Sequence, residues 1–454
     1  MPNLQNNYDF FSSAPNRFQT PLFLAGQRVG FVGDSLTRLG AYHRNIYLFY
    51  ATRYPGRKLV TRNFGISGNT AEGCVNRFEW DIQPFKADVL TITTGVNDSR
   101  IGLYETDAPD ATNLAERKKA IDTHVKSTRK FVKMAKECGS KVIVISPALY
   151  DQTAEMECPK RTGVNEALQT MADCDRRTAE AFGCPFIDLN TPMKRINDMM
   201  QQANPQYTLV GPDRVHPQGV GHLVMAVAVL KAQGVTPVVA EVSLDARAQE
   251  HVMIRNCSIS ELHVDSERIN FTYQANALPF PLRPDQKAIA DFYDFHSDMN
   301  GEIIRIDNMP AGKYRICIDG KPLTTASARQ LADGVNLSLL RTPQLKQAND
   351  VRKLVEKRHL LEQTLRVRLL LKQQFYADKG ELTWKEENSI LLDALSKLGT
   401  VTLWDTFRAK NIRAYLKVGA RREELWGKVA AMTDEIYRIN QPTRHDIAIL
   451  TDRR

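Results

Sequence analysis

Asp213 and His216 are three positions apart and could together supply a general base. They belong to the run Asp213-Arg214-Val215-His216-Pro217. Within one turn the carboxylate can accept the Nδ1 proton of the imidazole, which leaves Nε2 free to take up a proton. Taken alone, an Asp-x-x-His segment is also an ordinary start of a surface helix.

Ser35 lies in Gly33-Asp34-Ser35-Leu36-Thr37, where a predicted strand gives way to a helix. At such a junction the backbone N–H of the serine and those of its helix neighbours point toward negative charge that develops on a bound carbonyl oxygen. A serine that caps the N-terminus of a helix explains the same pattern without any chemistry.

Two further turns carry groups that could stabilise an oxyanion. The turn GISGNT, residues 65–70, contains Gly68, and a glycine allows the backbone to approach a ligand and expose an N–H. The turn TGVNDSR, residues 94–100, contains Asn97, whose side-chain amide can donate to an oxyanion. An ordinary turn, in which Asn and Asp bond their own backbone, is the alternative explanation.

The elements that must position these residues alternate between strand and helix from residue 28 to residue 234. This alternation predicts a parallel sheet covered by helices. Functional residues of such sheets gather at the carboxyl ends of the strands, where these turns occur. We expect a helix over about residues 114–138 and strands at residues 28–32, 59–64, 88–94, 141–146 and 186–188.

The four motifs, taken together and in this order, resemble those of the SGNH or GDSL hydrolases over about residues 26–235. The resemblance implies a three-layer α/β/α parallel-sheet domain and a serine esterase. Ser35 would be the nucleophile, His216 the base and Asp213 the group that orients the imidazole. The oxyanion would be held by the backbone N–H groups of Ser35 and Gly68 and by Asn97. The family pattern implies no metal and no cofactor.

The substrate is suggested by the polar side chains of the surrounding loops, which suit a sugar better than an alkyl chain. Within this family we therefore expect hydrolysis of an O-acyl ester, preferably O-acetyl, on a carbohydrate. Lipid or thioester acyl hydrolysis is the alternative activity, and a glycan-binding protein without catalysis is the third hypothesis. The loops hold Arg38, Tyr42, His43, Arg77, Trp80, Asp98 and Arg100. Of these, Asp98, Arg100, Tyr42 and Trp80 are the predicted substrate contacts.

The chain is expected to continue beyond the hydrolase domain, since 454 residues exceed one compact core. We predict an N-terminal extension at 1–25, the hydrolase domain at 26–235, a small β-sandwich-like region at 240–340 and a basic helical region at 341–454. The sequence Asp319-Gly320 predicts a hairpin turn. The β-rich region resembles the accessory part of some bacterial multidomain esterases of this family.

The net charge of +9 is unevenly distributed along the chain. Residues 351–454 hold 21 basic and 14 acidic side chains, and residues 1–350 hold 40 and 38. A nearly neutral hydrolase domain argues against a nucleic-acid partner. We expect the basic side chains of the tail helix to form a solvated face, with binding to an anionic polymer or membrane surface as the alternative. These side chains are Lys353, Lys357, Arg358, Arg366, Arg368 and Lys372.

The sequence gives few indications of the partners and the cellular compartment of the protein. The substrate is expected to be an acylated small molecule or polysaccharide, and oligomeric state is not indicated. The longest apolar run, residues 223–230, is too short to cross a membrane. The first 18 residues lack the features of a signal peptide, which leaves open a cytoplasmic protein or a secreted or periplasmic one whose leader has been removed.

Seven cysteines without CxxC pairs favour reduced thiols over a disulfide among Cys158, Cys174 and Cys184.

Overall fold

The computed structural model describes residues 10–11, 17–265, 267–399 and 402–452, which fold into two compact units. Unit 1 comprises Met1–Asn45, Leu59–Gln233 and Glu356–Thr433, and unit 2 comprises Ile46–Lys58, Gly234–Val355 and Asp434–Arg454. Each unit therefore combines segments that are distant in the sequence. The expected N-terminal extension lies largely outside the described residues, and the bounds of the four expected regions stay predictions.

Unit 1 is built on a five-stranded parallel sheet with the strand order β2-β1-β3-β4-β5. The residues of β1, β3 and β4 are almost all buried, as expected for a parallel sheet that is covered on both faces. The predicted parallel α/β sheet is thus confirmed. Its strands are β1 (Arg28–Gly33), β2 (Val60–Gly65), β3 (Val89–Thr93), β4 (Lys141–Ile145) and β5 (Phe186–Ile187).

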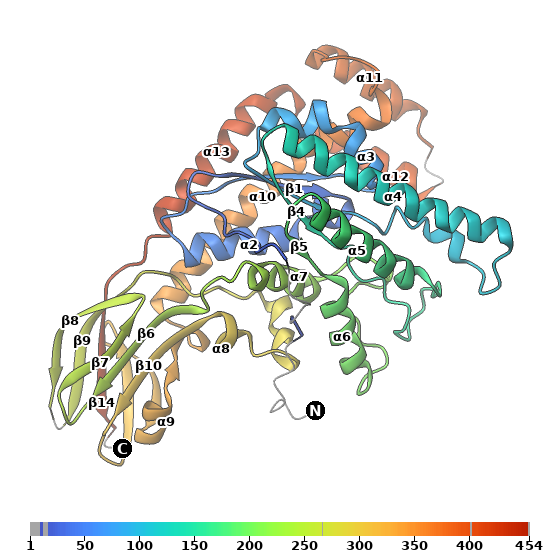
Figure 1. Ribbon diagram of the computed structural model, residues 1–454. Coiled ribbons are helices and arrows are strands. Elements are labelled where there is room, and N and C mark those ends of the chain that lie inside the picture. Colours follow the sequence, from blue (N-terminus) through green and yellow to red (C-terminus); the bar gives the residue numbers. More distant parts are fainter. Residues whose placement is uncertain (1–9, 12–16, 266, 400–401, 453–454) are drawn as a thin grey trace. The chain divides into compact units, whose positions relative to one another are not determined.

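Neighbouring residues of β1 show the two faces of this sheet, because successive side chains of a strand point in opposite directions. Val32 belongs to a core cluster with residues of α3 (Ala71–Asn76) and α4 (Ala111–Glu137), including Phe131. Phe31 instead packs on the rings of Tyr42 and His43 in α2 (Ala41–Arg53), at 6.2 and 4.7 Å between centroids. The sheet is therefore the middle of three layers (Figure 1).

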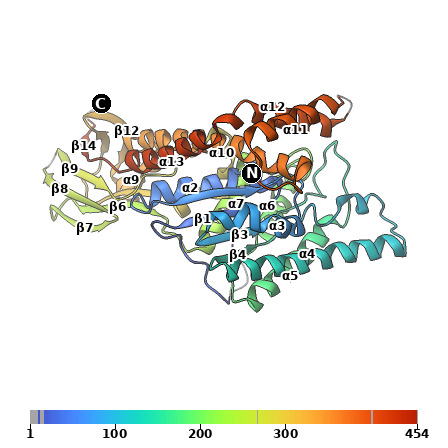
Figure 2. The same cartoon turned by 90° about the horizontal axis from the view of Figure 1, so that it is seen from above.

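The other helices of this part of the chain lie between the strands or follow the last of them. The expected helix at 114–138 is α4, which begins earlier because the Asp110 side chain accepts a hydrogen bond from Asn113 N–H at 2.7 Å and caps its first turn. The remaining helices are α1 (Ser35–Leu39), α5 (Val164–Ala181), α6 (Asn190–Gln201) and α7 (Gly219–Ala232). Figure 2 gives a second view of these elements.

One long C-terminal helix covers strand β2, which is one of the two edge strands of this sheet. Helix α10 (Pro343–Phe375) contributes Glu362, whose Oε1 accepts from Asn63 N–H at 3.0 Å. It also contributes Arg358, whose Nη2 donates to the Thr61 carbonyl at 3.0 Å. These side chains occupy backbone groups that an edge strand otherwise leaves available for pairing with another chain.

We expected six basic side chains of α10 to be solvated, and this expectation is wrong for three of them. Arg358, Arg366 and Lys372 are more than 90% buried. A buried cation needs a partner. Arg366 Nη2 donates to Asp81 Oδ2 at 2.9 Å, and Arg368 pairs with Glu387 at 2.6 Å. Helices α11 (Trp384–Lys397), α12 (Leu403–Leu416) and α13 (Arg422–Ile439) complete the predicted helical region.

Unit 2 contains two packed sheets, of strand order β13-β10-β6-β7 and β12-β11-β14-β9-β8, whose apolar side chains share one core. This confirms the predicted β-rich module. The first sheet comprises β6 (Val238–Asp245), β7 (Glu250–Arg255), β10 (Gly301–Asp307) and β13 (Val335–Asn336). The second comprises β8 (Cys257–Val264), β9 (Arg268–Ala275), β11 (Lys313–Ile318), β12 (Lys321–Ser327) and β14 (His445–Thr451). Two short helices, α8 (Phe295–Met299) and α9 (Ala328–Asp333), accompany them.

Strand β14 is an element that the sequence analysis did not predict. It lies between β11 and β9 and thus completes the second sheet. The expected hairpin turn at Asp319-Gly320 is present between β11 and β12, with φ of 50° and 72° at the two residues. The seven cysteines are free thiols, so the alternative of a disulfide among Cys158, Cys174 and Cys184 is wrong. None of the helices in the described part of the chain has the length and apolar character to span a membrane.

Candidate active site

Three of the four predicted motifs leave the sheet at the same edge. Gly33 at the end of β1 is in register with Gly65 of β2 and with Thr93 of β3, so the segments that follow these strands start side by side. Ser35 is the first residue of α1, where a backbone N–H has no acceptor within the helix. The Asp34 side chain caps this helix by accepting from Leu36 N–H at 2.9 Å.

Two glycines shape the second loop. Gly65 lies so close to α1 that a Cβ on it would be 2.0 Å from the backbone nitrogen of Arg38. The absence of a side chain here therefore lets the loop approach the helix of Ser35. Gly68 has φ of +77°, a conformation that glycine adopts without strain, and it is exposed with open space around its Cα. Its backbone is accessible to a ligand.

The serine, histidine and aspartate form a continuous chain of hydrogen bonds. His216 Nε2 is 2.8 Å from Ser35 Oγ, and His216 Nδ1 is 2.6 Å from Asp213 Oδ2. Since an ionised carboxylate only accepts, Nδ1 donates to Asp213 and Nε2 is left to accept the Ser35 proton. The side chains of His216 and Asp213 are 36% and 51% exposed, so the site is open to solvent.

Asp213 is held in its ionised form by the turn in which it lies. Partial burial opposes ionisation, but the backbone N–H and ring of His216 and the Val215 N–H donate to the carboxylate and hold its pKa below the ordinary value. The two backbone donors lie 2.9 and 3.1 Å from Asp213 Oδ1. The same carboxylate therefore fixes the turn and orients the imidazole.

Arg214, which lies between Asp213 and His216 in the sequence, anchors this turn. The sequence analysis did not predict this role. Arg214 has φ of +65°, which is rare for a residue with a side chain, and its guanidinium is buried. Three of the carbonyls that accept from it lie within 3.0 Å and belong to Asp151, Ala154 and Cys158. An arginine saturated by backbone carbonyls holds the 151–158 segment against the Asp213–His216 turn.

Asn97 lies close to Asp34, the residue that caps helix α1. Its Nδ2 donates to the Asn69 carbonyl at 2.9 Å and lies 3.5 Å from Asp34 Oδ2. Burial raises the pKa of Asp34 to about 7, although the hydrogen bond from Leu36 N–H opposes this shift. An amide nitrogen has two hydrogens, and the contact with Asp34 is long. One N–H of Asn97 is therefore available to donate to an oxyanion while the other keeps its bond to the Asn69 carbonyl.

A buried histidine between two carboxylates supports the Asn97 loop. His124 of α4 lies 3.1 Å from Asp98 through Nδ1 and 3.1 Å from Asp175 of α5 through Nε2. Asp98 Oδ1 also accepts from Ala71 N–H at 3.0 Å, which ties the loops of Asn97 and Gly68 together. Burial disfavours the charged ring, but Asp175 and Asp98 outweigh it and raise the pKa of His124 to about 10.

Replacing His124 by glutamine is expected to lower the free energy of unfolding by about 3–5 kcal/mol at pH 7, because it leaves two buried carboxylates without their cation. The pKa of His124 is higher in the folded than in the unfolded chain. Its stabilising effect is therefore complete below the ordinary histidine value and is lost as the pH rises toward about 10. Urea unfolding of both proteins from pH 6 to pH 10 measures this difference.

His263→Gln is the matched control, because His263 forms an exposed pair with Asp265 at 3.1 Å, with side chains 53% and 40% exposed. An exposed pair contributes little to stability, because solvent screens it. A His124→Gln protein as stable as this control at every pH would show that the buried pair does not hold the two loops.

The structure corrects two of the four predicted substrate contacts. Tyr42 is fully buried, with its hydroxyl 3.1 Å from Thr37 Oγ1, and Asp98 is buried against His124. Neither can touch a substrate in this arrangement. Arg100 pairs with Glu116 at 2.9 Å, and the Lys372 Nζ lies 5.1 Å from the centroid of the Trp80 ring. Contact of Arg100 and Trp80 with a substrate stays a prediction. His43 and Arg77, also in these loops, are buried.

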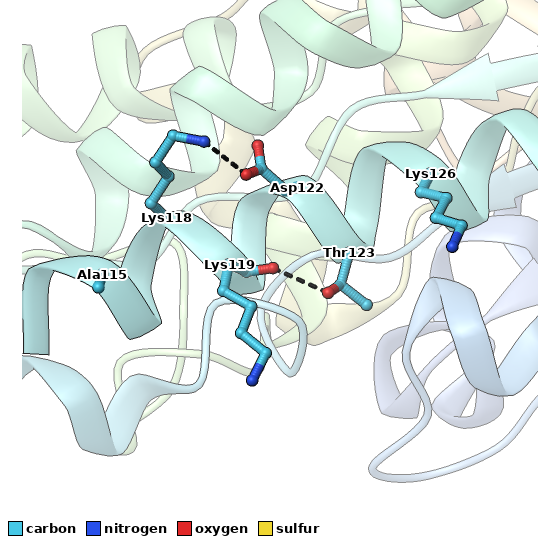
Figure 3. Close-up of a pocket in the computed structure, with 6 residues that line it drawn as sticks. All are labelled: Ala115, Lys118, Lys119, Asp122, Thr123 and Lys126. Carbon is cyan, nitrogen blue, oxygen red and sulfur yellow. Dashed lines mark hydrogen bonds and ion pairs between the residues drawn. The ribbon is translucent and has the colours of Figure 1, made fainter. Parts of the chain in front are cut away.

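A separate hollow of about 360 Å³ lies along one side of α4 (Figure 3). It is lined by Ala115, Lys118, Lys119, Asp122, Thr123 and Lys126, and it includes none of the predicted site residues. Lys118 pairs with Asp122 at 2.6 Å, and the Thr123 hydroxyl donates to the Lys119 carbonyl at 2.8 Å. Surface side chains that satisfy one another do not form a catalytic site. Across the described residues, no group of three or more His, Cys, Asp or Glu side chains is arranged to hold a metal ion.

Comparison with known sequences points to the region that contains the four motifs. The model of the GDSL-like lipase/acylhydrolase family matches residues 31–224, which include all four motifs. The chain is also similar to the acetylxylan esterase of Geobacillus stearothermophilus, with 25% identity over 225 residues. That similarity covers 46% of this chain and 95% of the relative.

Comparison with solved structures extends the similarity to both units. A structure described as a gut microbial diltiazem-metabolizing enzyme is 30% identical and has a TM-score of 0.86. The similarity covers 96% of this chain and 100% of that one. The similarity therefore includes the parallel sheet, the β-rich module and the C-terminal helices.

Proposed function

The chain belongs to the SGNH/GDSL hydrolases, the family of GDSL-like lipases and acylhydrolases, and is a hydrolase of ester bonds; from this premise we propose that it removes O-acetyl groups from a carbohydrate through Ser35, His216 and Asp213. One observation carries the proposal, namely the hydrogen-bonded chain from Ser35 Oγ through the imidazole to the Asp213 carboxylate. Its geometry suits transfer of the serine proton to Nε2.

The proposed reaction proceeds in two steps. As Ser35 Oγ attacks the ester carbonyl, its proton passes to His216 Nε2, and Asp213 stabilises the imidazolium. The oxyanion takes hydrogen bonds from the backbone N–H groups of Ser35 and Gly68 and from Asn97. Collapse of this intermediate transfers the proton to the leaving alcohol and leaves acetyl on Ser35. Water, deprotonated by His216, then releases acetate and restores the serine.

The acetyl group and the sugar are supported by the similarity to an acetylxylan esterase and by the open, polar surroundings of the serine. Hydrolysis of longer acyl chains, as in a lipid or thioester acylhydrolase, would need an apolar channel. We therefore expect kcat/KM to fall as the acyl chain of p-nitrophenyl esters lengthens from acetyl to octanoyl. A rise with chain length would favour the lipid or thioester alternative.

A second candidate substrate is the drug diltiazem. The observation that favours it is the similarity, over 96% of this chain, to an enzyme described as metabolizing that drug. Incubation with diltiazem beside acetylated xylan and acetylated pectin, with acetate and drug followed by chromatography, ranks these substrates. Loss of diltiazem without acetate release from either polysaccharide would favour the drug over an acetylated carbohydrate as the substrate.

The third hypothesis, a glycan-binding protein without catalysis, predicts that none of these esters is consumed. In that case the polysaccharides would be retained by the protein, and Ser35→Ala would leave the retention unchanged. Acetate release by the wild-type protein that is lost in Ser35→Ala would rule this hypothesis out.

A further inference from the structure

Arg38 is a cation near the nucleophile that has no acidic partner among the described residues. It lies three residues after Ser35 on the same short helix. Its Nη2 donates to Asn411 Oδ1 at 2.9 Å, and its Nη1 is 3.4 Å from Ser67 Oγ. The guanidinium carbon lies 5.5 Å from the centroid of the Phe407 ring. All three partners are electrically neutral.

The other largely buried arginines of unit 1 are compensated. Arg77, Arg358 and Arg366 each pair with a carboxylate, at Asp81 or Glu362. Arg214 is saturated by backbone carbonyls. Burial lowers the pKa of Arg38, and no carboxylate in the described structure counters this. A partly desolvated guanidinium without an anion gains most when a ligand supplies one.

The position of Arg38 places it beside the proposed oxyanion donors. Ser67, which its Nη1 approaches, directly precedes Gly68, and Gly65 packs on the backbone of Arg38 itself. The guanidinium remains partly exposed. A group bound there would belong to a substrate that also reaches the loop of Gly68.

Helix α12 holds the guanidinium in place. The Nδ2 of Asn411 donates to the Phe407 carbonyl at 2.8 Å, which leaves its Oδ1 to accept from Arg38. Trp404 on the same helix is 60% exposed, and its ring lies 5.8 Å from that of Phe407 in an edge-on arrangement. An exposed indole offers an apolar face to a flat ligand or a sugar ring, with a cation nearby.

We propose that Arg38 binds a carboxylate of the substrate, so that the preferred esters are acetylated sugars that carry a carboxylate, as uronic acids do. The planar guanidinium fork matches a carboxylate in two parallel hydrogen bonds, which a neutral xylose unit cannot supply. This inference rests on the proposed esterase function and narrows its substrate class.

The first test compares a matched pair of esters, 4-acetoxybenzoate and its methyl ester, which differ in the free carboxylate. A charge-assisted hydrogen bond is worth about 1.5–3 kcal/mol, or about 10- to 100-fold in affinity. Arg38→Gln should therefore lower the ratio of kcat/KM for the anionic over the neutral ester by about 10-fold or more, mainly through KM. Arg38→Lys should retain part of the preference for the anionic ester. In the wild type, added salt should reduce this preference.

Arg129→Gln is the matched control, because Arg129 also lies over a phenylalanine ring, that of Phe182 at 5.4 Å, but on the exposed surface of α4. It should leave the ratio as in the wild type. If Arg38→Gln slows both esters equally and the ratio stays within about twofold of wild type, Arg38 only supports the loop and the proposal is wrong.

The second test measures binding without catalysis, by calorimetry with trigalacturonate and xylotriose on Ser35→Ala protein. We expect the acidic sugar to bind more tightly, and the addition of Arg38→Gln to abolish that preference. If wild type hydrolyses no ester yet this preference is found, the proposed esterase function fails and the carboxylate site stands. If acetate is released but neither the ratio nor the binding depends on Arg38, the site is refuted and the esterase stands.

Discussion

Ser35→Ala is expected to lower the rate of acetyl ester hydrolysis by about 10⁴-fold or more, because the residual activity of such sites comes from the oxyanion donors and substrate binding alone. The side-chain partner of Ser35 Oγ is the imidazole of His216, at 2.8 Å. Removing one hydroxyl there should leave the fold intact. Steady-state release of p-nitrophenol and of acetate, with the melting temperature of each protein, measures both effects.

Ser260→Ala is the control for this experiment, since Ser260 is exposed on strand β8 of unit 2. Its activity should equal that of the wild type. Comparable rates for Ser35→Ala and Ser260→Ala would remove Ser35 from the mechanism, whatever the melting temperatures.

His216→Gln is expected to cost about 10⁴-fold or more in kcat as well, because no other group lies within hydrogen-bond distance of Ser35 Oγ among the described residues to take its proton. In the wild type, kcat/KM should fall once the solution is acid enough to protonate the imidazole, since a protonated ring cannot accept the serine proton. The pH profile of p-nitrophenyl acetate hydrolysis shows this limb.

The chain offers a matched control for His216→Gln in His263→Gln, which alters a second exposed Asp–His pair, one without a serine partner among the described residues. This variant should keep the wild-type rate and the wild-type profile. A profile that stays flat on acidification, or equal losses in the two variants, would contradict the role of His216 as base.

The sequence could indicate a candidate site because each part of that site is local. Ser35, Gly68 and Asn97 each follow a strand whose apolar residues are recognisable, and parallel strands end at one edge of the sheet. Asp213 and His216 lie in a single turn, so their pairing needs no knowledge of the fold. What the sequence could not give is the 2.8 Å contact of Ser35 with a residue 181 positions later.

The supporting residues escaped prediction because their partners are distant in the chain. His124 meets Asp175 51 residues later, and nothing in the helical pattern around His124 marks it as a buried cation. The charges of α10 were expected in solvent because amphipathic spacing does not reveal that Arg358 and Glu362 contact a strand some 300 residues earlier. Tyr42 was expected at the substrate for a similar reason, since a polar aromatic residue near a motif is indistinguishable from one in the core.

Strand β14 did leave a local signal. In His445–Thr451 the apolar residues Ile447 and Ile449 alternate with Asp446 and Ala448, the period of a strand with one buried face. The helical composition of the preceding hundred residues obscured it. A strand that completes a sheet from the far end of the chain is positioned by its tertiary partners β9 and β11, which the sequence does not indicate.

The most direct test of the proposed mechanism is covalent labelling of the folded protein with a fluorophosphonate, followed by intact-mass measurement and peptide mapping. A serine activated by His216 should acquire one adduct per chain, located on Ser35, and the adduct should be absent from Ser35→Ala. An unlabelled wild-type protein, or an adduct that persists in Ser35→Ala, would contradict the assignment of Ser35 as the nucleophile.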